Sequence, residues 1–117
     1  MALSERELIE QFRPDAVNLD GELYLEVQRA LEFVWACDRN DLAVIGIDGA
    51  VIREGAVKPH PDVVADYSSF PTTTSWEDYR VACNQSATDL LRDLADRKGL
   101  IIHCRVLAAA EWFPPLR

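Results

Sequence analysis

Apolar residues recur every three or four positions between Ser75 and Gly99, and this spacing predicts an amphipathic helix of about twenty-two residues. Ser75 is a suitable N-cap, and Asp78 lies three positions later, where an acidic side chain can reach back to the cap. Gly99 ends the pattern, since glycine readily takes the positive φ of a helix C′ position. The stripe expected to face the core consists of Trp76, Tyr79, Cys83, Ala87, Leu90 and Leu94, with Leu91 at its margin.

Two more helices are expected nearer the N-terminus. Ser4 and Glu7 form a capping box that opens a short helix, and Pro14 closes it because the residue before a proline resists the α conformation. Asp20 can cap a second helix, which we expect from Glu22 to about Cys37.

The expected helix from Glu22 to about Cys37 is apolar on more than one side. Either it contacts core on several sides, or Leu25 or Trp35 is exposed as an interface anchor. We favour contact with the core.

The middle of the chain predicts a β-hairpin. Residues 42–47 are apolar and rich in β-branched side chains, which indicates a strand buried on both faces. Asp48-Gly49 and Glu54-Gly55 are both candidate turns. We favour Glu54-Gly55, which makes Gly49 a bulge inside one longer strand.

The remaining segments are shorter. Lys58-Pro59-His60-Pro61 can only be an extended edge, since each proline lacks a donor, and residues 63–67 continue a strand pattern. A loop is expected from Ser68 to Ser75, and a half-buried strand from Leu100 to Leu107 with His103 and Arg105 on its outer face. Trp112 and Phe113 form a tail that we expect to be docked.

This order of elements favours a single α+β domain over residues 1–117. We expect a small, largely antiparallel sheet of three to four strands, packed against two long helices and one short N-terminal helix. The helices should lie on one side of the sheet.

Charge narrows the range of functions. The 117 residues include 12 basic and 20 acidic side chains, for a net charge of −8 and a pI of about 4.6. This balance argues against a nucleic-acid partner and permits an acidic face for a basic partner, although acidity also serves solubility alone. No segment has the length of a membrane span or the pattern of a signal peptide, so we expect a cytoplasmic protein without a membrane partner.

Catalytic and metal-binding patterns are missing from the sequence. Three cysteines, Cys37, Cys83 and Cys104, lie in apolar surroundings and lack the paired spacing of a zinc site. No nucleophile elbow and no phosphate-binding glycine pattern occurs. We therefore expect no metal, no cofactor and no enzyme; an enzyme using His103 remains an alternative that predicts a deep pocket around this residue.

One group of residues is singled out as a partner-binding candidate. Asp48, Glu54, Asp62, Asp66 and Tyr67 all lie on or beside the predicted hairpin. Neighbouring carboxylates repel unless a partner or a turn requires them, and a tyrosine beside them suits an interface. The alternative is that these acids only form turns.

Three features resemble bacterial immunity proteins of polymorphic toxin systems, nearest to immunity protein family 40. A helix leads into Val44-Ile45-Gly46-Ile47-Asp48-Gly49, Asp66-Tyr67-Ser68 closes the second strand, and Ser75-Trp76-Glu77-Asp78-Tyr79 opens a helix that carries Asn84 and Ala87. The resemblance covers about residues 20–107. It implies a non-catalytic protein that binds and neutralises a cognate toxin, and no catalytic residue is carried over.

Two functions from different classes follow. The first is a toxin-neutralising binding protein that uses an acidic surface, and the second is a small adaptor that oligomerises through the Glu22–Cys37 helix. The sequence leaves the oligomeric state open.

Overall fold

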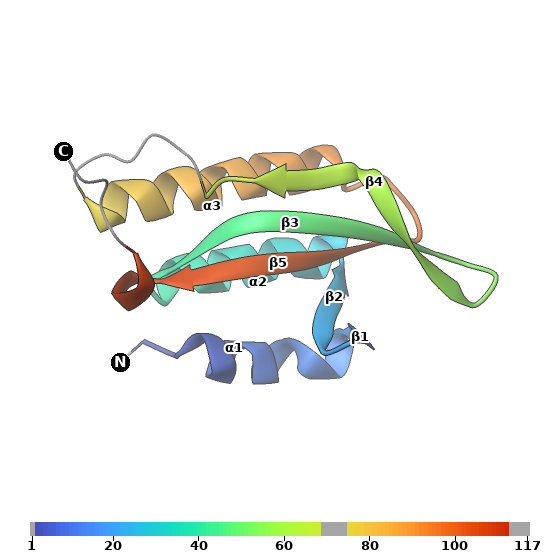
Figure 1. Ribbon diagram of the computed structural model, residues 1–117, viewed down its shortest axis with the longest axis horizontal. Helices are drawn as coiled ribbons and strands as arrows, with labels where there is room; N and C mark the ends of the chain where they lie inside the picture. Colours follow the sequence, from blue (N-terminus) through green and yellow to red (C-terminus); the bar gives the residue numbers. More distant parts are fainter. Residues whose placement is uncertain (1, 69–74, 113–117) are drawn as a thin grey trace.

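A computed structural model describes residues 2–68 and 75–112 of the protein (Figure 1). It has α+β architecture, with one antiparallel sheet and three α-helices in the described part. The elements in chain order are α1 (Glu5–Phe12), η1 (Arg13–Asp15), β1 (Val17–Leu19), β2 (Glu22–Glu26), α2 (Val27–Arg39), β3 (Leu42–Arg53), β4 (Ala56–Asp66), α3 (Trp76–Asp93), β5 (Leu100–Ala108) and η2 (Ala109–Glu111).

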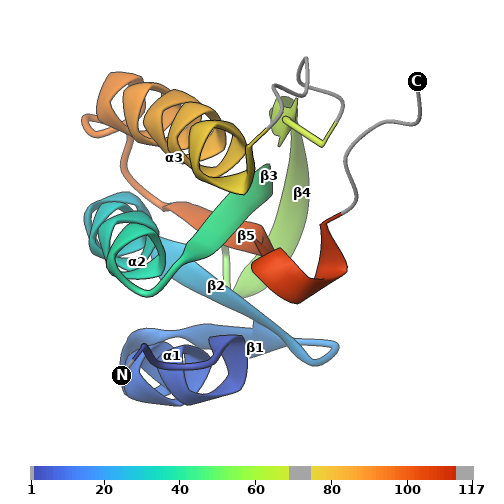
Figure 2. The ribbon, with the colours of Figure 1, turned by 90° about the vertical axis from the view of Figure 1, so that its left-hand side faces the viewer.

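The sheet has five strands in the order β1-β2-β5-β3-β4, more than the three to four that we expected. Helices α2 and α3 lie on one side of it, as predicted, α1 runs along the lower edge beside β1 and β2, and the opposite face carries no described α-helix (Figure 2). The core lies between this sheet and the helices, where α3 and α2 both contribute fully buried side chains.

One additional strand, β1, precedes the segment that we expected to be a helix, and the other, β2, replaces the start of that helix. Residues Glu22–Glu26 are strand β2, and α2 begins only at Val27. Asp20 and Gly21 have φ of 52° and 84°, so they form a tight turn between β1 and β2 instead of a helix cap. The prediction of a helix from Glu22 was therefore wrong over its first five residues.

The β3–β4 hairpin turns at Glu54-Gly55, as predicted, with φ of 53° and 76° at these two residues. The pairing register shifts between Asp48 and Ala50, but the extra residues lie on β4, where residues 60–63 oppose Gly49 alone. The predicted bulge was therefore assigned to the wrong strand. A side chain at Gly49 would place its Cβ 2.6 Å from the Cβ of Val63, so glycine lets the two strands approach. The two prolines lie in β4, the edge strand.

Helix α3 begins as predicted and ends earlier. The Ser75 side chain accepts a hydrogen bond from the Asp78 amide at 3.0 Å. The helix ends at Asp93, whereas Gly99, with φ of 75°, follows a further turn and leads into β5. Leu91, placed at the margin of the stripe, is fully buried, and Leu90 is only half-buried.

A buried amide fixes α3 against the start of β3. Asn84, 4% exposed, accepts a hydrogen bond from the Val44 amide at 2.7 Å and donates to the Leu42 carbonyl at 3.0 Å. It also donates to the Asp38 carboxylate at 2.8 Å. Because Asn84 satisfies backbone groups that no strand partner reaches, it has a structural role here.

The C-terminal tail docks where the structure describes it. The ring of Trp112 lies 5.9 Å from that of Trp76 and 5.8 Å from that of Tyr79, between centroids. Phe113 and most of the predicted loop before Ser75 lie outside the described residues. Among the described helices, none is long and apolar enough to cross a membrane.

Candidate functional site

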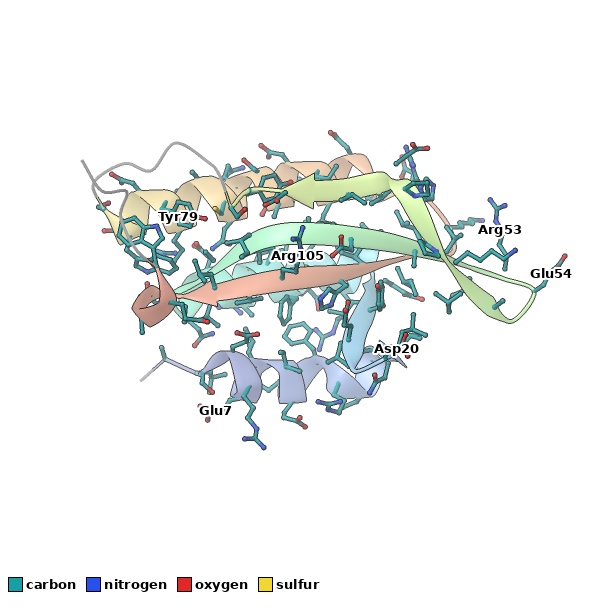
Figure 3. All side chains as sticks on the ribbon, viewed as in Figure 1. Glu7, Asp20, Arg53, Glu54, Tyr79 and Arg105 are labelled. Carbon is teal, nitrogen blue, oxygen red and sulfur yellow. The ribbon has the colours of Figure 1, made fainter. Side chains whose placement is uncertain are left out.

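The five predicted site residues do not form one cluster. We call the sheet face away from α2 and α3 the open face. Asp48 lies on this face in β3, and Asp62 and Asp66 are exposed on β4. Glu54 lies at the tip of the hairpin, well away from the centre of the sheet (Figure 3). Tyr67 directly follows β4 and is treated separately because its side chain is buried.

Tyr67 points away from the open face. Its side chain is 9% exposed, and its hydroxyl donates to the Ser86 carbonyl of α3 at 3.3 Å. Its amide donates to the Ile45 carbonyl at 2.7 Å. The expectation of an aromatic side chain presented beside the acids was wrong, because the two-residue period from Val63 places Tyr67 on the core face.

Arg105, which was not among the predicted site residues, connects three strands on the open face (Figure 3). Its guanidinium donates to the Ala65 carbonyl of β4 at 3.0 Å. Its Nε lies 3.4 Å from the Asp48 carboxylate of β3. The side chain crosses Gly46, where a Cβ would overlap the guanidinium. Asp48 is therefore neutralised within the protein.

Asp66 is held by the turn that follows β4. Its Oδ1 accepts hydrogen bonds from the Ser68 hydroxyl at 2.6 Å and from the Ser68 amide at 2.9 Å. These bonds, and more weakly the charge of Arg105, hold the pKa of Asp66 below its usual value. The carboxylate is thus ionised and exposed.

The other half of the open face is formed by β2 and β5. The rings of Tyr24 and His103 lie 5.6 Å apart between centroids. The Nδ1 of His103 lies 3.0 Å from the Leu23 carbonyl oxygen, so this nitrogen carries the hydrogen, and Nε2 lies 3.4 Å from Glu22. Burial, followed by the charges of Glu22 and Asp48, raises the pKa of Tyr24.

A cavity of about 690 Å³ lies beside His103, between α1 and β5. The alternative of an enzyme using His103 predicted a pocket at this place. However, both ring nitrogens of His103 already face protein atoms, which leaves neither one directed freely at a ligand.

The thiols are poorly suited to nucleophilic chemistry. Burial raises the pKa of Cys104 to about 12, with a smaller effect from Asp48, and burial raises the pKa of Cys37 and Cys83 as well. Within residues 2–68 and 75–112, no three His, Cys, Asp or Glu side chains form a group able to hold a metal ion.

The apolar surface through which an adaptor would oligomerise is smaller than expected, because only part of the predicted Glu22–Cys37 helix is exposed as helix α2. Leu25 is 4% exposed and belongs to β2, so it anchors the core and not an interface. Trp35 is 39% exposed on α2, and Val81 of α3 is 48% exposed. Together they line a small groove between the two helices.

The signal for Arg105 was present in the sequence. The alternation from Leu100 to Leu107 places Arg105 outward, but its partners on β3 and β4 are about forty or more residues away in sequence and follow only from strand pairing. In comparisons with known proteins, no family model matches this chain and no curated protein shows significant similarity to it.

Proposed function

We propose that this protein is a non-catalytic immunity protein, which binds and neutralises a cognate bacterial toxin in the cytoplasm. The proposal rests on the sequence resemblance and on the net charge of −8, which favours a basic partner. The partner surface we propose is the open sheet face along β4.

One observation carries the proposal. Val64 and Asp66 pair with Asp48 and Gly46 of β3, which places both on the sheet face that α2 and α3 leave uncovered. Asp62 is exposed next to them, in the stretch of β4 where the pairing register shifts. Val64 is 58% exposed, and both carboxylates are exposed beside it. An apolar contact flanked by charge is the composition of a protein interface, and exposed carboxylates accelerate association with a basic partner.

The original five-residue site is revised accordingly. Asp48 is paired with Arg105 and Tyr67 is buried, so neither contributes a free group to this surface. Glu54 lies at the distant hairpin tip and can contact only a partner that extends along the whole hairpin.

Binding of a basic toxin domain encoded beside this gene tests the proposal. Asp62→Lys should weaken the affinity at least about tenfold, mostly through slower association, because an attractive charge becomes repulsive. Association of the unchanged protein should slow as salt rises. Biolayer interferometry at low and high salt measures both effects.

Asp93→Lys is the matched control, since it makes the same charge change at an exposed position of α3, away from the open face. It should alter the affinity by less than about twofold. Equal weakening by both variants would mean that only net charge matters, and no binding by the unchanged protein would refute the proposal.

A second candidate, an enzyme using His103, is favoured by the cavity beside that residue. Because Leu23 and Glu22 hold both ring nitrogens, proton transfer by His103 requires one of these contacts to break. We therefore infer that the cavity is better suited to holding a ligand than to catalysis.

A further inference from the structure

The cavity exists because β2 and β5 separate. They pair only at Leu25 with Ile102 and at Glu26 with Ile101. Beyond these pairs, β5 continues to Ala108 without β2 beside it, and α1 runs along this side instead (Figure 1). We call the resulting cavity of about 690 Å³ the α1–β5 cleft.

The inner wall of the α1–β5 cleft is apolar. Phe12 and Phe33 meet edge to face, with their ring centroids 5.2 Å apart, and both line the cleft. Further apolar lining comes from Ile9, Leu25 and Ile102. A cavity of several hundred Å³ with an apolar wall and a few polar groups is typical of small-molecule sites and far larger than a bare ion needs.

Some charged side chains that line the cleft form ion pairs, and others do not. Arg13 forms an ion pair with Glu10 at 2.8 Å, and Glu22 faces His103. Arg6 also lines the cleft. Two further carboxylates, Glu5 and Glu111, line it as well, and neither has an ion-pair partner among the described residues.

The carboxylate of Glu5 has no direct hydrogen-bond or ion-pair partner among the described residues, although this residue is half-buried. Burial raises its pKa, and the like charge of Glu111 raises it further, whereas His103 acts in the opposite direction. Glu111 accepts one hydrogen bond, from the Ala108 amide at 3.0 Å.

We propose that the α1–β5 cleft binds a small organic cation, with an apolar body against Phe12 and Phe33 and an ammonium group between Glu5 and Glu111. A cation at this place would supply the charge that these two carboxylates lack. The apolar wall would be covered by a hydrocarbon or aryl group. This site is independent of the proposed toxin-binding surface on β4.

A set of three probes of the same shape tests the charge requirement. They are 4-phenylbutylamine, its neutral alcohol analogue 4-phenylbutanol and the anion 4-phenylbutyrate. Titrations followed by ¹H–¹⁵N NMR should show the amine shifting amides of α1 and β5, with an affinity at least about tenfold above that of the alcohol. The anion should not bind.

Variants test whether Glu5 and Glu111 are the carboxylates that bind the ammonium group. Glu5→Gln and Glu111→Gln should each reduce the affinity for the amine toward that of the alcohol, while binding of the alcohol stays unchanged. Glu77→Gln is the matched control, since it removes the same charge at an exposed position on α3. The amide spectrum of each variant without probe verifies that it is folded.

Three results would overturn the inference. The amine could bind no better than the alcohol, the shifts could lie outside the cleft, or the amine could bind Glu5→Gln as well as the unchanged protein. Absence of any shift at millimolar amine would also count against it. A peptide rich in lysine that shifts the same amides more strongly than the amine would instead assign the cleft to a protein partner.

Discussion

The contact between Arg105 and Gly46 is the residue-scale feature on which the open face depends. Arg105 starts on β5, crosses β3 above Gly46 and reaches the Ala65 carbonyl of β4. A residue without a side chain is needed at the crossing point, because a Cβ would occupy the space of the guanidinium. The same crossing places a positive charge between Asp48 and Asp66.

Gly46→Ala should therefore displace Arg105. The protein would lose the hydrogen bond to Ala65 and would accommodate an overpacked side chain, so we expect the free energy of unfolding to fall by about 1–3 kcal/mol. The ion pair with Asp48 adds little to this loss, because the side chains of Arg105 and Asp48 are 40% and 35% exposed. Urea denaturation measures the change.

The Arg105→Ala background is the control. Once the guanidinium is gone, Gly46→Ala should be neutral or slightly stabilising, because alanine restricts the unfolded chain more than glycine does. An equal cost in both backgrounds would show that the contact with Arg105 does not require the glycine.

At the scale of secondary-structure elements, two tight turns define the strand pairing. Asp20-Gly21 joins β1 to β2, and Glu54-Gly55 joins β3 to β4, with positive φ at all four residues. Glycine takes this conformation freely, and aspartate tolerates it, but glutamate does not. Glu54 is thus the least suitable of the four residues.

Glu54→Asn should stabilise the protein by about 0.5–1 kcal/mol, because asparagine with glycine is a preferred pair for such a turn. Thermal unfolding measures the gain. Glu54→Gln is the control, since it removes the same charge without relieving the backbone. If glutamine stabilises as much as asparagine, the cause is charge and not turn geometry.

The features of the fold that depend only on neighbouring residues could be predicted from the sequence. The caps at Ser4 and Ser75 and the turn at Glu54-Gly55 were predictable, because each depends on neighbouring residues. Residues Glu22–Glu26 were not, since their apolar spacing fits both periods. The strand forms because β5 offers Ile101 and Ile102 as partners, which is a tertiary effect.

The candidate site was predictable to the same extent. Asp62 and Asp66 are exposed as expected, and continuing the alternation past Val63 would have placed Tyr67 in the core. The neutralisation of Asp48 could not be predicted, because Arg105 lies 57 positions later in the sequence, on a strand whose pairing the sequence does not specify.

At the scale of the whole molecule, folding raises the pKa of some carboxylates and lowers the pKa of others. The pKa of Glu5 is raised, first by burial and then by Glu111. Hydrogen bonds from Ser68 lower the pKa of Asp66, and those from Ser4 lower the pKa of Glu7. The stability should therefore first rise and then fall as the pH is lowered.

The native protein takes up a proton at Glu5 before the unfolded chain does, so stability should rise as pH falls through the raised pKa of this group and level off below its ordinary pKa of 4.5. Asp66 acts in the opposite way. Its stabilising contribution is present above its ordinary pKa of 3.8 and is lost as pH falls through the lower value of the native state. The melting temperature should thus pass through a maximum on the acidic side of neutrality.

Scanning calorimetry from about pH 7 to about pH 3, at constant ionic strength, would locate this maximum. Glu5→Gln should raise the melting temperature at neutral pH and weaken the rise on acidification, because the half-buried carboxylate is gone. Glu77→Gln reduces the net charge equally at an exposed site and should keep the rise. If the two variants gave the same profile, general repulsion among the acidic residues would account for the pH dependence, and the half-buried position of Glu5 in the α1–β5 cleft would carry no measurable cost.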